Sequence, residues 1–196
     1  PPMSFASRAG EKLDHALKTF DVNVQGFVCA DFGSSTGGFV DCLLQHGAQK
    51  VYAVEKGYGQ LDWKLRNDPR VIVMERTNAM HAKLPEHVNL ITIDTSWTKL
   101  EKIIPNALAY LKLDGRIIAL LKPHYEADPH LLRKGKLPQE SINAVVDTVE
   151  KQLKDQGVKI LGKTYSPIVG SKGGNVEILL LLSRTSTLAH TTKNLV

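Results

Sequence analysis

The chain has 196 residues, of which 42% are hydrophobic and 23% are charged, so it suits one globular domain rather than two. Its 25 Lys and Arg against 20 Asp and Glu give a formal charge of +5, which favours an anionic partner without identifying one. We expect a single domain over residues 1–183 and a loose tail over residues 184–196.

The first predicted element is a helix, because apolar residues recur at helical spacing from Leu13 to Phe20, with Ser7 as a possible cap. Five short apolar runs then have the character of buried parallel strands. Helical patterns at residues 39–44 and 100–111 lie between them, and this alternation predicts a doubly wound α/β fold. The predicted strands are residues 27–32, 51–54, 71–74, 90–94 and 116–121.

The C-terminal third begins with a polar stretch, residues 123–138, that is longer than most connections and therefore typical of a functional or a disordered loop. A helix is predicted over residues 142–153. Residues 158–166 and 176–182 predict an antiparallel hairpin around a glycine-rich turn. The expected sheet is therefore seven-stranded and mostly parallel, with this hairpin at its C-terminal end.

Residues 31–39 form a glycine-rich turn after the first strand, where small residues let the backbone approach a ligand before a helix begins. Ser35 stands where a dinucleotide fingerprint needs glycine beside the pyrophosphate, which disfavours a nicotinamide cofactor. Glu55 ends the second strand, 22 residues after Gly33, and suits ribose hydroxyls. Tight packing alone would also explain such a turn, but together with Glu55 it favours S-adenosylmethionine. The predicted cofactor-binding residues are Asp31, Gly33, Ser34, Ser35, Thr36, Gly37, Gly38, Phe39, Glu55, Asn78 and Asp94.

Two of these assignments are specific. We expect Asp31 to hold the methionine end of the cofactor, directly or through water. Asn78 follows the third strand and is either a contact for the adenine edge or a helix cap.

Four ionisable residues occupy positions that are not readily explained as solvent-exposed surface: Lys12, Asp94, Lys122 and Glu177. Charges rarely occupy such apolar surroundings without a partner. Asp94 and Lys122 end strands, and ligands of open parallel sheets bind outside the carboxyl ends of the strands. Taken singly, each could be an ordinary ion pair or a solvated strand end.

The sequence resembles the hemolysin-type branch of the FtsJ-like RNA ribose 2'-O-methyltransferases over nearly its whole length. This resemblance implies a Rossmann-like methyltransferase sheet, S-adenosylmethionine as cofactor, and RNA as partner, with ribosomal RNA or a ribosomal subunit expected. It assigns the family's catalytic set to Lys12, Asp94, Lys122 and Glu177. The matching segments are SRAGEKL at 7–13, DFGSSTGGFVDCLLQHGA at 31–48, VYAVEKGYGQLDWKLRNDPRV at 51–71, ERTNA at 75–79, LKPHYE at 121–126 and GNVEILL at 174–180.

Some features depart from that pattern. We expect no S4-type RNA-binding domain in this chain, although relatives normally carry one. Residues 94–97 read Asp-Thr-Ser-Trp where the branch has Asp-Val-Ser-Phe, and the glycine-rich sequence expected after Glu126 is absent. These differences concern substrate loops more than the catalytic set.

In the mechanism that the resemblance implies, Lys122 is our choice for the base that removes the ribose hydroxyl proton. Either lysine could lose its proton on sequence grounds alone. Basic loop residues are expected to contact RNA, and aromatic residues to stack on splayed bases, although Trp63 better suits packing within a helix. The basic candidates are Arg133, Lys134, Lys136 and Lys172, and the aromatic ones are Trp97 and Tyr125, with His124 nearby.

Three other functions are alternatives on the sequence alone. They are a nicotinamide-dependent oxidoreductase, a lytic or pore-forming protein, and a catalytically weak or inactive RNA-binding domain that keeps the fold. The longest apolar run, residues 176–182, is far shorter than the roughly 20 residues of a membrane span. Cys29 and Cys42 form no cysteine motif, and none of the seven histidines stands at a metal-ligand spacing along the chain. We therefore expect a cytoplasmic protein without a membrane span or a metal site.

Overall fold

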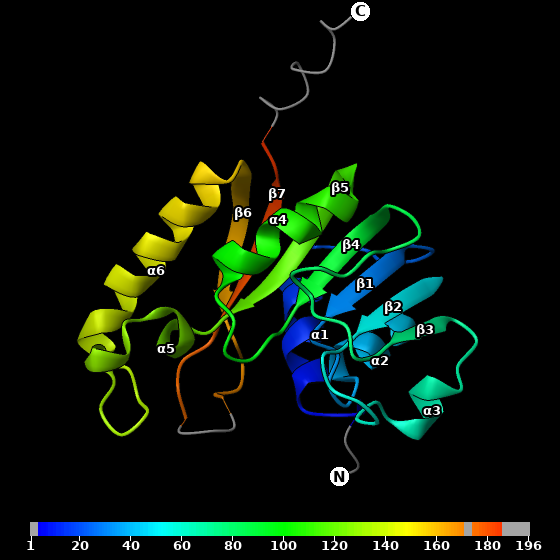
Figure 1. Cartoon of the computed structure of the whole chain (residues 1–196), viewed down its shortest axis with the longest axis horizontal. Helices are drawn as coiled ribbons and strands as arrows, with labels where there is room; N and C mark the ends of the chain where they lie inside the picture. The colour runs from blue at the N-terminus through cyan, green and yellow to red at the C-terminus, as the bar shows by residue number, and fades with distance from the viewer. Residues whose placement is uncertain (1–3, 171–173, 186–196) are drawn as a thin grey trace, which may run out of the picture.

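The computed structural model describes residues 4–170 and 174–185, which form one seven-stranded mixed sheet with helices on both faces (Figure 1). The strand order is β3-β2-β1-β4-β5-β7-β6, in which the first five strands run parallel and β7 is antiparallel to both of its neighbours. The predicted fold class is confirmed. The strands are β1 (Val28–Phe32), β2 (Lys50–Val54), β3 (Val71–Met74), β4 (Val88–Ile93), β5 (Leu111–Leu121), β6 (Val158–Tyr165) and β7 (Ile178–Arg184).

Each face of the sheet carries its own hydrophobic core, because successive side chains of a strand point to opposite faces. Along β7, Leu180 and Leu182 join the core under α4 and α6, whereas Leu179 and Leu181 join the core under α1 and α2. Figure 1 shows α1 and α2 on the other side of the sheet from α4. The helices are α1 (Ala9–Thr19), α2 (Gly38–Gln45), α3 (Trp63–Arg66), α4 (Leu100–Tyr110), α5 (Pro123–Glu126) and α6 (Gln139–Asp155).

The predicted loop over residues 123–138 contains two short helical turns, α5 and a 3-10 turn at Pro129–Leu131. Both begin with a proline, whose fixed φ and missing N–H suit the first helical position. The carboxylate of Asp128 accepts a bond from the His130 N–H at 3.0 Å and caps the second turn. The predicted loop therefore contains short helical turns that the sequence pattern did not predict.

Two boundary predictions also need correction. Ser7 does not cap α1, because Arg8 is the N-cap residue and no side chain bonds the first turn. Instead, the Ser7 hydroxyl packs against Gly38, where an added Cβ would lie 2.3 Å from its Oγ. Strand β5 begins at Leu111, five residues before the predicted Arg116, because pairing with β4 already starts at Leu111.

The predicted C-terminal tail begins within the last strand, since β7 extends to Arg184 and the Thr185 N–H donates to the Gly157 carbonyl at 2.9 Å. Residues 186–196, the remainder of that predicted tail, lie outside the described residues. None of the helices in the described ranges is long and apolar enough to cross a membrane.

Candidate active site

Two adjoining cavities open at the edge of the sheet where the parallel strands end. The first, about 520 Å³, is lined by Lys12, Lys122 and Glu177, and we call it the lysine cavity. The second, about 460 Å³, is lined by Glu55 and Asn78, and we call it the turn cavity. Both volumes fall within the usual range for small-molecule sites, roughly 300–1,000 Å³. Their shared wall consists of Gly33, Ser35, Asp94, Ser96 and Trp97.

The four residues predicted to be catalytic lie together in the lysine cavity as two ion pairs. Lys12 of α1 bonds Glu177, which immediately precedes β7. The Lys122 Nζ, directly after β5, lies 2.6 Å from Asp94 Oδ1, directly after β4. All four side chains are less than one-fifth exposed, and charges so nearly buried require partners. The site thus presents two oriented ammonium groups to one cavity.

The glycine-rich turn connects β1 to α2 through left-handed backbone conformations. Gly33 has φ +90°, and a Cβ there would lie 2.3 Å from the Asp94 carbonyl oxygen. Gly37 has φ +102°, and its Cβ would meet Leu65 at 2.3 Å. Ser35 and Trp97 also have positive φ, a conformation that costs non-glycine residues energy and gathers at functional sites. Both lie in the wall between the cavities.

Glu55 and Asn78 both line the turn cavity, as a pair of groups for one ligand requires. The Glu55 carboxylate accepts bonds from the Ser35 N–H at 2.8 Å and the Gly57 N–H at 2.7 Å, so it joins the turn to the end of β2. Asn78 Oδ1 accepts from the Met80 N–H at 2.9 Å. Asn78 therefore stabilises a turn rather than a regular helix, and still faces the cavity.

Asp31 is buried in β1 with only 1% of its surface exposed. Its Oδ1 accepts a bond from the Thr92 hydroxyl at 2.7 Å, while Oδ2 has no partner within the described ranges. Burial is the main reason that its pKa rises to about 7, although the Thr92 hydrogen bond lowers it. A buried carboxylate with one unpartnered oxygen thus lies directly behind the turn.

The remaining predicted cofactor residues do not line either cavity. Ser34, Gly37, Gly38 and Phe39 are buried, and Phe39 packs in the core under α1 and α2. Thr36 is exposed, and its carbonyl accepts the Asp62 N–H at 3.0 Å. These residues shape the turn, whereas Gly33, Ser35, Glu55, Asn78 and Asp94 face the space.

An aromatic group stands at the mouth of the lysine cavity. The rings of Trp97 and Tyr125 are 4.6 Å apart, and His124 is 4.3 Å from Tyr125. The Lys122 Nζ lies 5.5 Å from the centre of the Tyr125 ring. Burial, followed by the charge of Lys122, lowers the pKa of His124, which favours a neutral imidazole. Trp97 remains 79% exposed and available to a ligand.

The basic residues predicted to bind RNA have different outcomes. Lys134 lines a smaller cavity, about 230 Å³, together with Trp97 and Tyr125. Arg133 and Lys136 pair through their backbones next to it, while Lys172 lies outside the described residues. Trp63 does belong to a helix, α3, but it is 73% exposed, so its predicted packing role was wrong.

Sequence reasoning missed Arg8, which lines the lysine cavity. Its signal was available in the segment SRAGEKL, which resembles the family and also contains Lys12. A basic side chain at the cavity rim suits an anionic ligand.

A doubly wound sheet with a glycine-rich turn, a strand-end carboxylate and paired lysines at one edge is typical of α/β enzymes that bind a nucleoside-containing ligand beside the turn. The sequence profile of the FtsJ-like methyltransferases matches residues 5–184. The chain belongs to this family, and it is a methyltransferase.

Three relatives illustrate the similarity. A Bacillus subtilis protein provisionally named rRNA methyltransferase YqxC is 41% identical over 192 residues, which are 92% of this chain and 66% of that protein. The 16S/23S rRNA (cytidine-2'-O)-methyltransferase TlyA of Mycobacterium tuberculosis is 38% identical, over 98% of this chain and 73% of that protein. A solved structure from Streptococcus thermophilus, provisionally named a hemolysin, has a TM-score of 0.90 and 38% identity over 95% of this chain and 69% of its own.

Proposed function

We propose that this chain transfers a methyl group from S-adenosylmethionine to a ribose 2'-hydroxyl of ribosomal RNA. The observation that carries the proposal is the arrangement of the two ion pairs, Lys12–Glu177 and Lys122–Asp94, in a cavity that shares a wall with the glycine-rich turn. The names of the relatives support the chemistry, since the Mycobacterium protein is named a cytidine-2'-O-methyltransferase of rRNA.

The turn cavity suits the cofactor in the chemical types of its lining residues. Glu55 offers a carboxylate to the ribose hydroxyls, and Asn78 lies on the same wall and is suited to an adenine edge. Asp94 supplies negative charge next to the turn, which suits a ligand with a positive sulfonium. When bound, the cofactor supplies a methyl group on a good leaving group.

The chain's own residues must then hold the acceptor oxygen in line and remove its proton. We assign the base to Lys122, because its partner Asp94 lines both cavities, whereas Lys12 and Glu177 line the lysine cavity alone. Asp94 orients the Lys122 side chain, and the ammonium must give up its own proton before its nitrogen can accept the hydroxyl proton. The Lys12–Glu177 pair contributes a second ammonium and carboxylate to the same cavity.

The acceptor RNA would approach over Arg8 and the aromatic group, with Lys134 beside it. Phosphate contacts by basic side chains provide affinity, and unstacked bases find aromatic partners. A ribosomal substrate implies action in the cytoplasm, where ribosomes are assembled. Residues 1–183 would form the single catalytic domain.

The first test is a Lys122→Ala variant assayed with methyl-labelled S-adenosylmethionine and ribosomal RNA. We expect at least a hundredfold loss of methyl transfer, in the range of general-base contributions of about 10²–10⁴. Calorimetry should show that the variant still binds S-adenosylmethionine, because the turn cavity does not include Lys122. Lys151→Ala, an exposed lysine of α6, is the matched control and should retain full activity.

Unchanged transfer by Lys122→Ala would remove this lysine from the mechanism. Calorimetry with NAD in parallel should show no binding; tight NAD binding would revive the oxidoreductase alternative. RNA binding without any transfer by the unaltered protein would favour the inactive RNA-binding alternative.

A further inference from the structure

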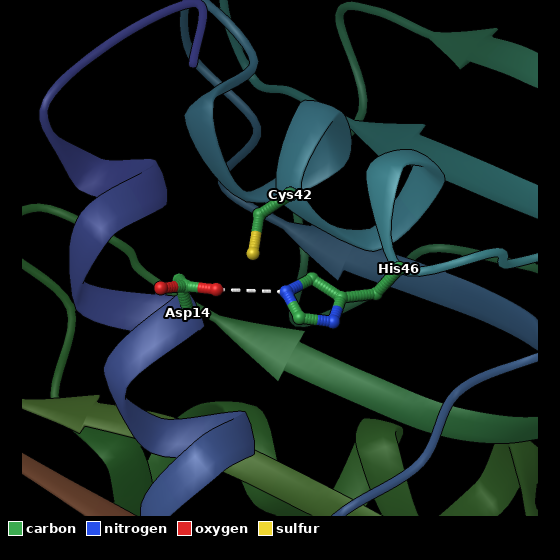
Figure 2. A group of neighbouring side chains, drawn as sticks. All are labelled: Asp14, Cys42 and His46. Carbon is green, nitrogen blue, oxygen red and sulfur yellow. Dashed lines mark hydrogen bonds and ion pairs between the residues drawn. The ribbon is translucent and has the colours of Figure 1, made fainter. Parts of the chain in front are cut away.

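A cluster of three potential metal ligands lies between α1 and α2, outside both cavities (Figure 2). Asp14 belongs to α1 and Cys42 belongs to α2. His46 is the C-cap residue that follows α2. One ligand atom from each lies within 4.8 Å of the other two. In Figure 2 the sulfur of Cys42 and the ring of His46 point toward Asp14. We propose that Asp14, Cys42 and His46 bind one zinc ion.

The helix geometry brings the donors together. Cys42 and His46 are four residues apart, so their side chains lie on the same face of α2. Asp14 faces them from the helix that packs against α2, and its Oδ1 lies 2.8 Å from His46 Nε2. His46 also stands at the C-terminal end of α2, where unpaired carbonyls favour a cation.

The donor types suit zinc, which binds thiolate, imidazole and carboxylate in tetrahedral geometry with bonds of about 2.0–2.3 Å. Such bonds place neighbouring donors roughly 3.3–3.6 Å apart. The Asp14–His46 contact would open by about half an ångström, and Cys42 would close a gap of at most 4.8 Å. When zinc binds, the thiol of Cys42 loses its proton to solvent and the thiolate sulfur binds the ion.

The residues around the cluster leave access for a water molecule as fourth ligand, and they orient the carboxylate of Asp14. Cys42 is fully buried, while the side chains of Asp14 and His46 are 22% and 32% exposed, so water can reach the ion from their side. Lys18 holds Asp14 Oδ2 at 2.6 Å and leaves Oδ1 for the metal. Partners of this kind fix the orientation of metal-bound carboxylates.

This site would connect two elements of the catalytic apparatus. Helix α1 carries Lys12, and α2 starts at the glycine-rich turn. An ion bound by both helices stabilises their contact, because a ligand that binds only the folded chain shifts unfolding toward the folded state. The sequence alone predicts no metal site here, because Asp14 lies 28 positions before Cys42 and the three residues form no motif along the chain.

The test titrates the reduced, metal-free protein with Co²⁺ alone and then with Zn²⁺ alone. We expect one Co²⁺ per chain, a thiolate-to-cobalt charge-transfer band, the strong visible bands of tetrahedral cobalt, and their loss when Zn²⁺ displaces the cobalt. Zinc should also raise the Tm by a few degrees. Cys42→Ser should abolish the charge-transfer band, and Asp14→Asn and His46→Gln should each weaken Co²⁺ binding at least tenfold.

Cys29→Ala and His15→Gln are the matched controls, because Cys29 lies in β1 and His15 contacts Thr164. Both should leave the cobalt spectrum unchanged. Should Cys42→Ser fail to fold, the variants of the partly exposed Asp14 and His46 still test the proposal. The proposal is overturned if no charge-transfer band appears, or if these variants bind Co²⁺ as the unaltered chain does. Neither result bears on methyl transfer.

Discussion

Asp31, which lies directly before the glycine-rich turn, makes the folding stability of the protein depend on pH. Its carboxyl is buried, bonded on one oxygen only, and has a pKa of about 7 instead of the usual 3.8. As pH rises from about 4 to about 7, the unfolded chain has released this proton while the folded chain still holds it. The folded state therefore binds more protons in that window, and its stability must fall with rising pH.

We predict that Asp31→Asn removes this fall, because the amide stays neutral and its oxygen can still accept the Thr92 hydroxyl bond. The difference between variant and unaltered protein should change by on the order of 3 kcal/mol between pH 4 and pH 7. Denaturant unfolding without cofactor, repeated across that range, measures it. Parallel pH curves for the two proteins would refute a raised pKa at Asp31.

At the scale of the element, the sequence predicted a helix or strand where a local pattern marks it, and it did not predict boundaries that depend on contacts between distant residues. Short apolar runs predicted β1, β2 and β3 within a residue, because parallel strands are buried on both faces. The starting point of β5 depends on its pairing with β4, which no local pattern records. The helical turns after Lys122 were missed because polar residues surround their two prolines.

The same difference applies to the site. Lys12 and Glu177 lie 165 positions apart and were joined only through a family resemblance, whereas the turn and Glu55 could be argued from local chemistry. Trp97 is exposed, contacts Tyr125 and has a left-handed backbone with φ +58°, and the sequence reveals none of these features.

We predict that the loop bearing Trp97 supplies a stacking surface for an unstacked base. Trp97→Ala should raise the KM for RNA about 5- to 100-fold, since stacking contributes about 1–3 kcal/mol per base. Trp97→Phe should retain most of the affinity. Trp63→Ala is the control, because Trp63 is also exposed but lies on α3, away from the two cavities. Equal effects at the two tryptophans would contradict a specific stacking role.

At the scale of the whole molecule, the pair Lys12–Glu177 joins the first helix to the last strand. Glu177→Gln should destabilise the protein by roughly 3 kcal/mol, because it leaves the largely buried ammonium of Lys12 without a counter-charge. The double variant Lys12→Met, Glu177→Leu should recover part of that stability, and neither variant should transfer methyl groups.

Denaturant unfolding provides the comparison, with the pair Lys163–Glu150 as control, because the Lys163 side chain is 47% exposed. Glu150→Gln should cost less than about 1 kcal/mol, as surface pairs do. If the double variant is as unstable as Glu177→Gln alone, the loss reflects packing at this position rather than an unpaired charge.

The position of the transferred methyl group tests the central claim most directly. The protein is incubated with methyl-labelled S-adenosylmethionine and ribosomal subunits, and the RNA is digested to nucleosides and separated. We predict that the label is recovered in a 2'-O-methylated nucleoside, and that Lys122→Ala yields none. Label on a base, or no label with the unaltered protein, would contradict the assignment of ribose methylation to this site.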